Sequence, residues 1–165
     1  MTGAPYFTPE LFDFLRQLKR RNKRDWFTRN KPRYEQAIRN PALLFIAAVT
    51  PGLAKLSRKL PAAALRGSLF RIYRDVRFSS DKRPYKTHIG MQWTYAKSKD
   101  AHSPCYYLHF EPDGCFVAAV DLSERQICSP KFIPDLLAAC RTMTPLVEFT
   151  WQALAQKAQA AEVAL

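Results

Sequence analysis

Apolar residues near the start of the chain recur at the spacing of an amphipathic helix. Between residues 8 and 21 this apolar stripe consists of Leu11, Phe14, Leu15 and Leu18. Such spacing places the four side chains on one face of an α-helix. Thr8 is a favoured N-cap residue, and Pro9 suits the first turn, where no backbone N–H donor is needed. The pattern therefore predicts a helix that begins at Thr8 and Pro9.

Two further helices are predicted in the rest of the amino-terminal third. One begins near Asn30, with Pro32 in its first turn, and the next begins at Asn40. Both starts combine a capping residue with an early proline. Pro51 and Gly52 interrupt the third pattern. Because proline lacks an N–H donor and its ring clashes with the preceding turn, we expect a kink or a break there.

From residue 70 the apolar period changes to two, which is typical of a strand. Phe70, Ile72, Val76 and Phe78 would share one face of this strand. Residues 87–95 alternate in the same way, and residues 105–122 predict a hairpin around the turn at residues 112–114. Together these segments predict a mainly antiparallel sheet of about four strands.

The carboxyl-terminal region predicts helices again. Ser129 precedes Pro130, and Thr144 precedes Pro145, so each pair combines a cap with a proline at the first helical position. The second of these helices ends in an Ala-rich stretch, a good helix former.

These elements place the chain in the α+β class. Helices come first, a mainly antiparallel sheet follows, and helices close the chain. With 165 residues the chain is long enough to bury one ordinary core. We expect a single domain over residues 1–165, made of a helical part at 1–60, a sheet at 68–123 and a second helical part at 129–165.

The charge of the chain is unevenly placed. Residues 1–99 carry 22 Lys and Arg against 6 Asp and Glu, whereas residues 100–165 carry 4 against 8. A molecule polarised in this way attracts polyanions to one side. Solubility and ordinary helix-surface charge explain the same asymmetry equally well, so the basic character alone does not identify a partner.

No segment predicts a membrane span or a secretion signal. A span needs roughly 18 or more consecutive apolar residues, and the longest apolar run here is Ala42–Val49. The amino end lacks a basic region followed by an apolar core. The four cysteines include no CxxC pair, so they predict reduced thiols rather than a disulfide framework or a structural zinc site. We expect a cytoplasmic protein with no membrane partner.

Arg74 is the anomaly of the charged segment, because it falls on the apolar face of the predicted strand. A guanidinium removed from water needs a carboxylate partner. Asp75 and Asp81 are the near candidates, and Glu111 on the later hairpin is the distant one. The simpler interpretation is therefore an ion-pair network that sets the register of the strands.

The alternative is a site for a phosphate-bearing ligand. Arginine can bind two phosphate oxygens at once with its planar fork, and tyrosines between the cations can stack on bases. The candidate ligand-binding residues are Arg71, Arg74, Arg77, Lys82, Arg83, Tyr85, Lys86 and His88. This interpretation and the ion-pair network do not exclude each other.

Catalysis would need acid–base groups near the same segment. The plausible acid–base or metal-binding residues near it are Asp75, Asp81, His88, His109 and Glu111, of which Asp75, Asp81, His109 and Glu111 are the candidate catalytic residues. His109 and Glu111 would share a strand face, where they could bind a divalent cation or move a proton. A two-residue His-x-Glu pattern is common by chance, so we favour a structural pair and predict no metal site. The chain contains no Walker loop, GxGxxG, GxSxG or HExxH motif, and no cofactor is identified.

Three stretches carry a resemblance to a known family. They are "FTPELFDFLRQLKRRNKRDWF", "RIYRDVRFSSDKRPYKTHIG" and "YYLHFEPDG". From Phe7 to about Val117 the chain resembles the DUF2461 family of uncharacterised proteins. Family members usually continue with a Gly-rich segment after the strand beginning at Phe116 and carry a longer stretch before the last helices. This chain has neither, so it resembles a shortened member, and the resemblance implies no known activity.

Three functions are consistent with the sequence. The first is binding of nucleic acid or a phosphorylated small molecule through the basic segment. The second is an enzyme acting on an anionic or phosphorylated substrate. The third is a non-catalytic scaffold for a protein partner. We rank them in this order, and the oligomeric state is not predicted.

Overall fold

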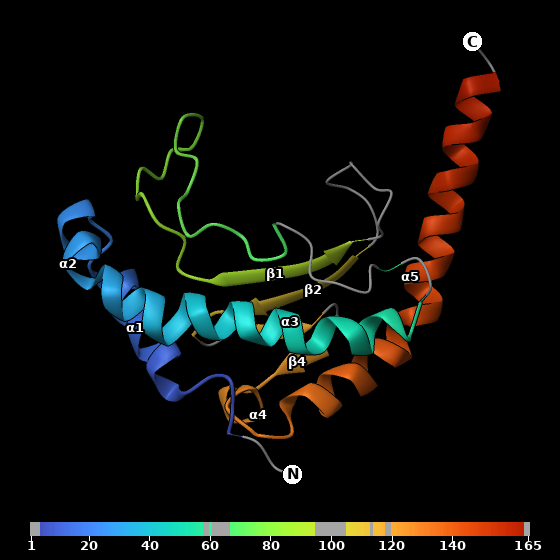
Figure 1. Ribbon diagram of the computed structural model, residues 1–165. Coiled ribbons are helices and arrows are strands. Elements are labelled where there is room, and N and C mark those ends of the chain that lie inside the picture. The colour runs from blue at the N-terminus through green and yellow to red at the C-terminus, as the bar shows by residue number, and fades with distance from the viewer. Residues whose placement is uncertain are drawn as a thin grey trace.

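The computed structural model describes residues 4–57, 60, 67–94, 105–112, 114–117 and 120–163. Helices and an antiparallel sheet alternate along the chain in the order shown in Figure 1. The helices are α1 (Pro9–Arg20), α2 (Arg24–Tyr34), the π-helical turn η1 (Glu35–Arg39), α3 (Asn40–Ala54), α4 (Glu124–Ile127) and α5 (Phe132–Val163). The strands are β1 (Ile89–Thr94), β2 (Cys105–Phe110), β3 (Cys115–Val117) and β4 (Val120–Leu122). The α+β class is confirmed.

Helix α1 forms where the apolar stripe predicts it. Its buried side chains are Leu11, Phe12, Phe14, Leu15 and Leu18. Thr8 occupies the N-cap position with an extended backbone, and Pro9 follows at the first position. The Thr8 side chain makes no capping hydrogen bond, so the predicted position is right although the expected contact is not formed.

The second helix begins earlier than predicted. Helix α2 starts at Arg24 rather than near Asn30, and Pro32 lies inside it. The reason is tertiary, because Trp26 and Phe27 are buried against Phe14, with ring centroids 5.5 and 6.4 Å away. Burial of these two aromatic side chains holds the first turn helical.

A π-turn joins α2 to α3 without a break. In η1 the backbone N–H of Asn40 donates to the carbonyl oxygen of Glu35, five residues back. The turn lies directly before Pro41, whose ring would meet the carbonyl of Ala37 in a regular α-helix. A wider turn relieves such crowding. The predicted separate start at Asn40 is therefore a change of helical type inside one continuous helix.

Of the kink or break expected at Pro51 and Gly52, the break is not formed, because α3 continues to Ala54, and the kink stays a prediction. Gly52 has a packing role instead. A Cβ atom on Gly52 would lie 2.6 Å from Cδ1 of Leu137 in α5, closer than carbon atoms approach. The missing side chain lets α3 and α5 pack closely against each other.

The continuous helical segment Arg24–Ala54 is long and apolar enough, by length and composition alone, to cross a membrane. This is weak evidence, because core helices pass the same test. Phe45, Val49 and Leu53 of this segment are buried in the core. The expectation that the protein has no membrane partner stays a prediction.

The sheet is antiparallel with the strand order β1-β2-β3-β4. Three of the four predicted strand segments form strands, and the last of them is divided into β3 and the short β4, which pair through Val117 and Val120. Strand β1 pairs with β2 along its length, from Ile89 opposite Phe110 to Thr94 opposite Cys105. The strand predicted at residues 70–78 is wrong.

Residues 70–78 belong instead to an irregular segment at the edge of the sheet. Isolated bridges join Leu69 to Met91 and Tyr73 to Tyr85. Ile72 is buried as the period predicts, whereas Phe78 is 94% exposed. The predicted alternation of burial therefore extends from Phe70 to Arg77, although these residues form no regular strand, and it ends at Phe78.

The two faces of the sheet differ. Tyr106, Leu108 and Phe110 of β2 are fully buried, and the Phe110 ring packs on Phe7 at 5.0 Å and on Phe132 of α5 at 6.0 Å. The helices cover this face (Figure 1). Alternation along the strand turns Tyr107 and His109 to the opposite face.

The two predicted carboxyl-terminal helices are one. Helix α5 runs from Phe132 to Val163 with Pro145 inside it, so Thr144 is not the cap that we expected. Ser129 does cap the turn that leads into the helix, because its hydroxyl accepts a hydrogen bond from the backbone N–H of Lys131 at 3.1 Å. The Thr144 hydroxyl lies 3.0 Å from the carbonyl oxygen of Cys140 and 2.7 Å from the Tyr106 hydroxyl. These contacts hold α5 against β2 next to Pro145, which has no backbone N–H to donate. The far part of α5 extends away from the sheet (Figure 1).

A buried hydrogen bond between α3 and β1 provides a test of the core. Trp93 Nε1 donates to Thr50 Oγ1 at 2.9 Å, and the Thr50 hydroxyl donates to the carbonyl oxygen of Ile46 at 2.6 Å. Replacing Thr50 by Val leaves the buried indole N–H without an acceptor. We expect Thr50→Val to lower the free energy of unfolding by about 1–3 kcal/mol, measured by urea denaturation. Thr50→Ser should keep the bond and lose less stability. Equal losses in both variants would contradict this account.

Candidate histidine–glutamate site

Tyr107 and His109 lie on the sheet face that the helices leave uncovered. The His109 ring stacks on Phe116 of β3, with centroids 4.8 Å apart and planes 9° apart. In the register of β1 and β2, His109 lies opposite Gly90. The imidazole is therefore held from the β3 side by an aromatic ring, while its neighbour on β1 has no side chain.

Gly90 allows a side chain from the preceding segment to lie over the sheet. A Cβ atom at this position would lie 2.7 Å from Cδ2 of Phe70 and 2.8 Å from the hydroxyl oxygen of Tyr107. The Phe70 and Tyr107 rings are tilted together with centroids 6.0 Å apart. Position 90 therefore requires glycine, because any side chain there would collide with these two rings.

Three potential ligand side chains meet beside this aromatic layer. His88 stacks on His109 with centroids 4.5 Å apart, and Nε2 of His109 lies 3.5 Å from Oε2 of Glu111. One ligand atom from each of the three lies within 4.8 Å of the others, and all three residues are half-buried. We call these three residues the histidine–glutamate site.

The strand register explains why these residues meet. Ile89 is opposite Phe110, so one more step along the same register places His88 opposite Glu111. Residues on one face of paired strands lie about 4.5–5.5 Å apart, and diagonal neighbours remain within reach of long side chains. His109 is the diagonal neighbour of His88, so three residues from two segments share one small area.

Two hydroxyl groups hold the outer atoms of the site. The Tyr107 hydroxyl lies 3.1 Å from Nδ1 of His109, and the Thr87 hydroxyl donates to Oε1 of Glu111 at 3.0 Å. Each contact uses the atom that faces away from the shared centre. The inner atoms, Nε2 of His109 and Oε2 of Glu111, remain directed toward each other.

Burial and nearby charge shift the protonation of this area. Burial, followed by the charge of His109, lowers the pKa of His88, and the carboxylate of Glu111 opposes the shift. The charge of Lys86 also lowers the pKa of His88. Burial and then the charge of Arg71 lower the pKa of Lys86. Cationic groups therefore surround the site on the side of the preceding segment.

Most of the cations predicted to bind phosphate are paired within their own segment. Arg74 contacts Asp81 at 2.5 Å, and its other guanidinium nitrogen lies 3.5 Å from the Ser79 hydroxyl. Arg83 contacts the same carboxylate at 2.6 Å. Asp81 thus resolves the anomaly of Arg74, and of the three carboxylates considered for it, this near one is the partner.

Three further residues that were predicted to bind a ligand, Arg77, Lys82 and Tyr85, are engaged in contacts within the protein. Arg77 forms a two-point ion pair with Asp75, at 3.1 and 2.7 Å. Lys82 donates to the carbonyl oxygen of Val76 at 3.1 Å. Tyr85 is buried, with its ring stacked on Phe27 at 4.1 Å, so its ring faces are not available to a base. Asp75 and Asp81, proposed from sequence as acid–base groups, are engaged in these ion pairs and lie outside the histidine–glutamate site.

The comparisons with known proteins identify a family. Residues 10–120 match the family described as a conserved hypothetical protein, DUF2461. The chain belongs to the DUF2461 family. The match is consistent with a shortened member, and it includes His88, His109 and Glu111 but not α4 or α5. No curated protein and no solved structure matches the chain.

The sequence predicted part of the histidine–glutamate site. It paired His109 with Glu111, and it named His88 both as a ligand-binding residue and among the acid–base or metal candidates. It did not place His88 beside that pair, and it gave Thr87 no role. A signal was present, because the two predicted strands imply a register in which His88 lies near Glu111. That register depends on the length of the connection between the strands, which the spacing of apolar residues does not specify.

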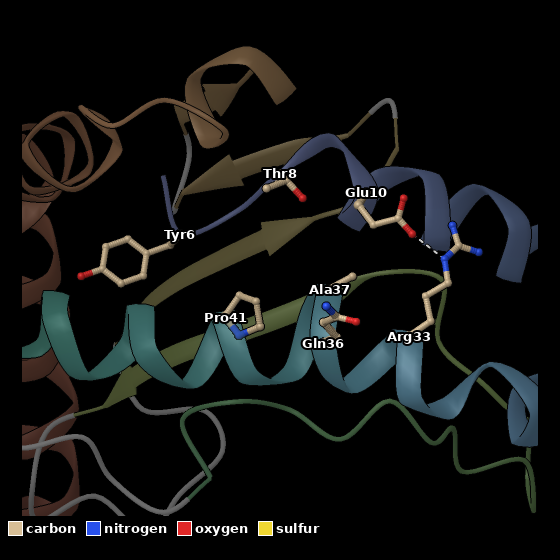
Figure 2. A pocket seen from close by; sticks show the side chains of 7 residues that line it. All are labelled: Tyr6, Thr8, Glu10, Arg33, Gln36, Ala37 and Pro41. Atoms are coloured by element: carbon tan, nitrogen blue, oxygen red, sulfur yellow. Dashed lines mark hydrogen bonds and ion pairs between the residues drawn. The ribbon is translucent and has the colours of Figure 1, made fainter. Parts of the chain in front are cut away.

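The DUF2461 chain also has a pocket of about 410 Å³ on the helical side (Figure 2). Its lining residues come from the start of α1 and from α2, η1 and α3, and include the ion pair of Arg33 with Glu10. In Figure 2 this ion pair closes one end and the Tyr6 ring lies at the other. A second pocket of about 380 Å³ involves Arg125 and Asp135. Neither is lined by the histidine–glutamate site.

The ion pairs of Asp81 can be tested by titration. Hydrogen bonds from the Arg83 side chain, then from its backbone N–H, and then from Arg74 hold the pKa of Asp81 well below its usual range. We expect the Asp81 carboxyl ¹³C signal to titrate well below the usual pKa of about 3.9. Arg83→Gln should raise the midpoint more than Arg74→Gln does.

The contribution of the Asp81 ion pairs to stability changes with pH in a defined direction. Because the pKa of Asp81 is lower in the folded chain, its contribution is fully present above the unfolded pKa, near pH 4, and is lost as the pH falls further. If Asp81 titrated near the ordinary pKa, Arg74 and Arg83 would not be paired with it. Both arginines would then be available to an anionic ligand, as the sequence predicted.

Gly90 provides a second test. An added methyl group would collide with Phe70 and Tyr107, so we expect Gly90→Ala to lower the free energy of unfolding by about 1–3 kcal/mol, measured by urea denaturation. Gly114→Ala is the matched control, because nothing lies within 4 Å of a Cβ atom there. The packing over β1 would be wrongly described if both variants were equally stable.

Proposed function

We propose that this DUF2461 protein binds a divalent transition-metal ion through His88, His109 and Glu111. The observation that supports the proposal is the convergence of one ligand atom from each residue within 4.8 Å. Two imidazoles and a carboxylate are a ligand set that zinc and ferrous ions accept. Magnesium and calcium prefer oxygen ligands alone, so the proposal concerns first-row transition metals.

The separation of the inner atoms suits such an ion. Metal–nitrogen and metal–oxygen bonds of about 2.0–2.2 Å at a tetrahedral centre place two ligand atoms about 3.4 Å apart. Nε2 of His109 and Oε2 of Glu111 are 3.5 Å apart. His88, now stacked on His109 with ring planes 28° apart, would have to rotate about its side-chain bonds to direct a ring nitrogen to the same ion.

The surrounding hydroxyl groups support the same proposal. A metal-binding histidine usually has its other ring nitrogen in a hydrogen bond, which selects the tautomer and orients the ring. Tyr107 occupies that position at His109, and Thr87 holds the outer oxygen of Glu111. The expectation of no metal site rested on the two-residue His-x-Glu pattern, to which the fold adds a third ligand and two supporting groups.

Three protein ligands leave coordination positions for water or a substrate. Catalytic zinc sites have this composition, whereas structural sites are closed by four protein ligands. We therefore propose an enzyme rather than a structural metal protein. When bound, the ion would polarise an oxygen of the substrate or activate a water molecule.

Cobalt binding tests the proposal. We expect the chelator-treated protein to bind Co²⁺ at a single site, measured by calorimetry and by the visible absorption of the ion. His109→Ala, His88→Ala and Glu111→Gln should each weaken binding at least tenfold. Tyr107→Phe should weaken binding less than loss of a ligand, because it removes only a supporting contact.

Asp75→Asn is the matched control, because it alters a nearby carboxylate that lies outside the site. Circular dichroism and urea denaturation would show whether each variant remains folded. The proposal is wrong if the wild type binds Co²⁺ no more tightly than a folded variant that lacks all three ligands.

A further inference from the structure

Two cations near the histidine–glutamate site have no carboxylate partner. In the parts of the chain that the structure describes, no Asp or Glu oxygen lies within 4.0 Å of the side-chain nitrogens of Lys86 or Arg71. Their neighbours Arg74, Arg77 and Arg83 are all paired with aspartates. Lys82 of the same segment also has no carboxylate partner, but its Nζ is hydrogen-bonded to the carbonyl oxygen of Val76.

Backbone pairing places Lys86 near the site. The N–H of Lys86 donates to the carbonyl oxygen of Ile72 at 2.8 Å, which places Lys86 beside the residue that follows Arg71. Lys86 is also only two residues before His88. Lys86 thus lies next to a proposed metal ligand, and the positive charge of Arg71, from a separate stretch of the chain, acts on Lys86.

Side-chain contacts continue from Lys86 to the metal ligands. Nζ of Lys86 lies 5.3 Å from the centre of the Phe70 ring, and Phe70 packs on Tyr107. Tyr107 in turn contacts Nδ1 of His109. The ammonium group is held by a cation–π contact, which keeps it near the open face of the sheet without neutralising it.

We infer that the ligand of this site is a small phosphate-bearing anion, held between the metal ion and the side chains of Lys86 and Arg71. The inference rests on the proposed metal site. A divalent ion beside Glu111 leaves one positive charge, and the two cations increase it further. Because a phosphate group has several charged oxygens, it can contact a metal ion and two cations at once.

A small molecule fits better than a nucleic acid. Binding to a polynucleotide requires cations spread along a surface to neutralise successive phosphates. Here three arginines of the basic segment are paired with aspartates, and the Tyr85 ring is buried. Within residues 70–88, as the structure describes them, only Arg71, Lys82 and Lys86 are cations without a carboxylate partner. Lys86 is the one beside the site, so the charge there matches one phosphate group.

Phosphorus NMR of inorganic phosphate with the Co²⁺-loaded protein tests the inference. A phosphate bound beside the paramagnetic ion should show a broadened ³¹P signal that saturates with phosphate concentration. The zinc-loaded protein should give no such broadening. We expect Lys86→Gln to weaken phosphate binding at least fivefold while Co²⁺ binding is retained. Acetate at equal concentration should not displace the phosphate.

Lys82→Gln is the matched control, because it removes the same charge from the same segment at a residue bonded to the Val76 carbonyl. It should leave phosphate affinity unchanged. Equal losses in the two lysine variants would mean a general charge effect and would overturn the inference. Tight Co²⁺ binding without phosphate broadening would overturn the inference alone. Absence of Co²⁺ binding would overturn the metal proposal and this inference together.

Discussion

The register between β1 and β2 is the constraint on which the rest of the structure depends. It is set by burial, because Tyr106, Leu108 and Phe110 must all face the helices. A slip of one residue would exchange the two faces of the strand and place His109 in the core. The same register, extended by one residue, places His88 next to Glu111. The register that packs the core therefore also brings the residues of the site together.

The basic segment, residues 70–88, contains both cations paired with aspartates and cations without a carboxylate partner. Asp81 accepts from Arg74 and Arg83 and fixes the loop that follows the Tyr73–Tyr85 bridge. The total of 26 Lys and Arg residues thus overstates how many cations are available to a ligand. Among the described residues of this segment, Arg71, Lys82 and Lys86 have no carboxylate partner, and Lys86 lies two residues before the proposed ligand His88.

At several helix boundaries, tertiary packing overrides the local pattern of prolines and capping residues. Prolines at positions 32, 51 and 145 predict starts or breaks, yet each lies inside a helix. A proline costs about 3 kcal/mol in a helix interior, which several buried side chains can offset. Trp26 and Phe27 extend α2 toward the amino end, and Gly52 packs on α5. Local capping signals cannot show these contacts.

The sequence by itself determined the α+β class, helix α1 and the core-facing alternation of β1 and β2, because these depend only on which side chains leave water. It also paired His109 with Glu111, since they are two residues apart on one strand. Only the tertiary structure decided that His88 joins them and that Asp81 binds Arg74. Both outcomes depend on the path of an irregular segment, which is set by contacts among residues distant in sequence rather than by a repeating pattern.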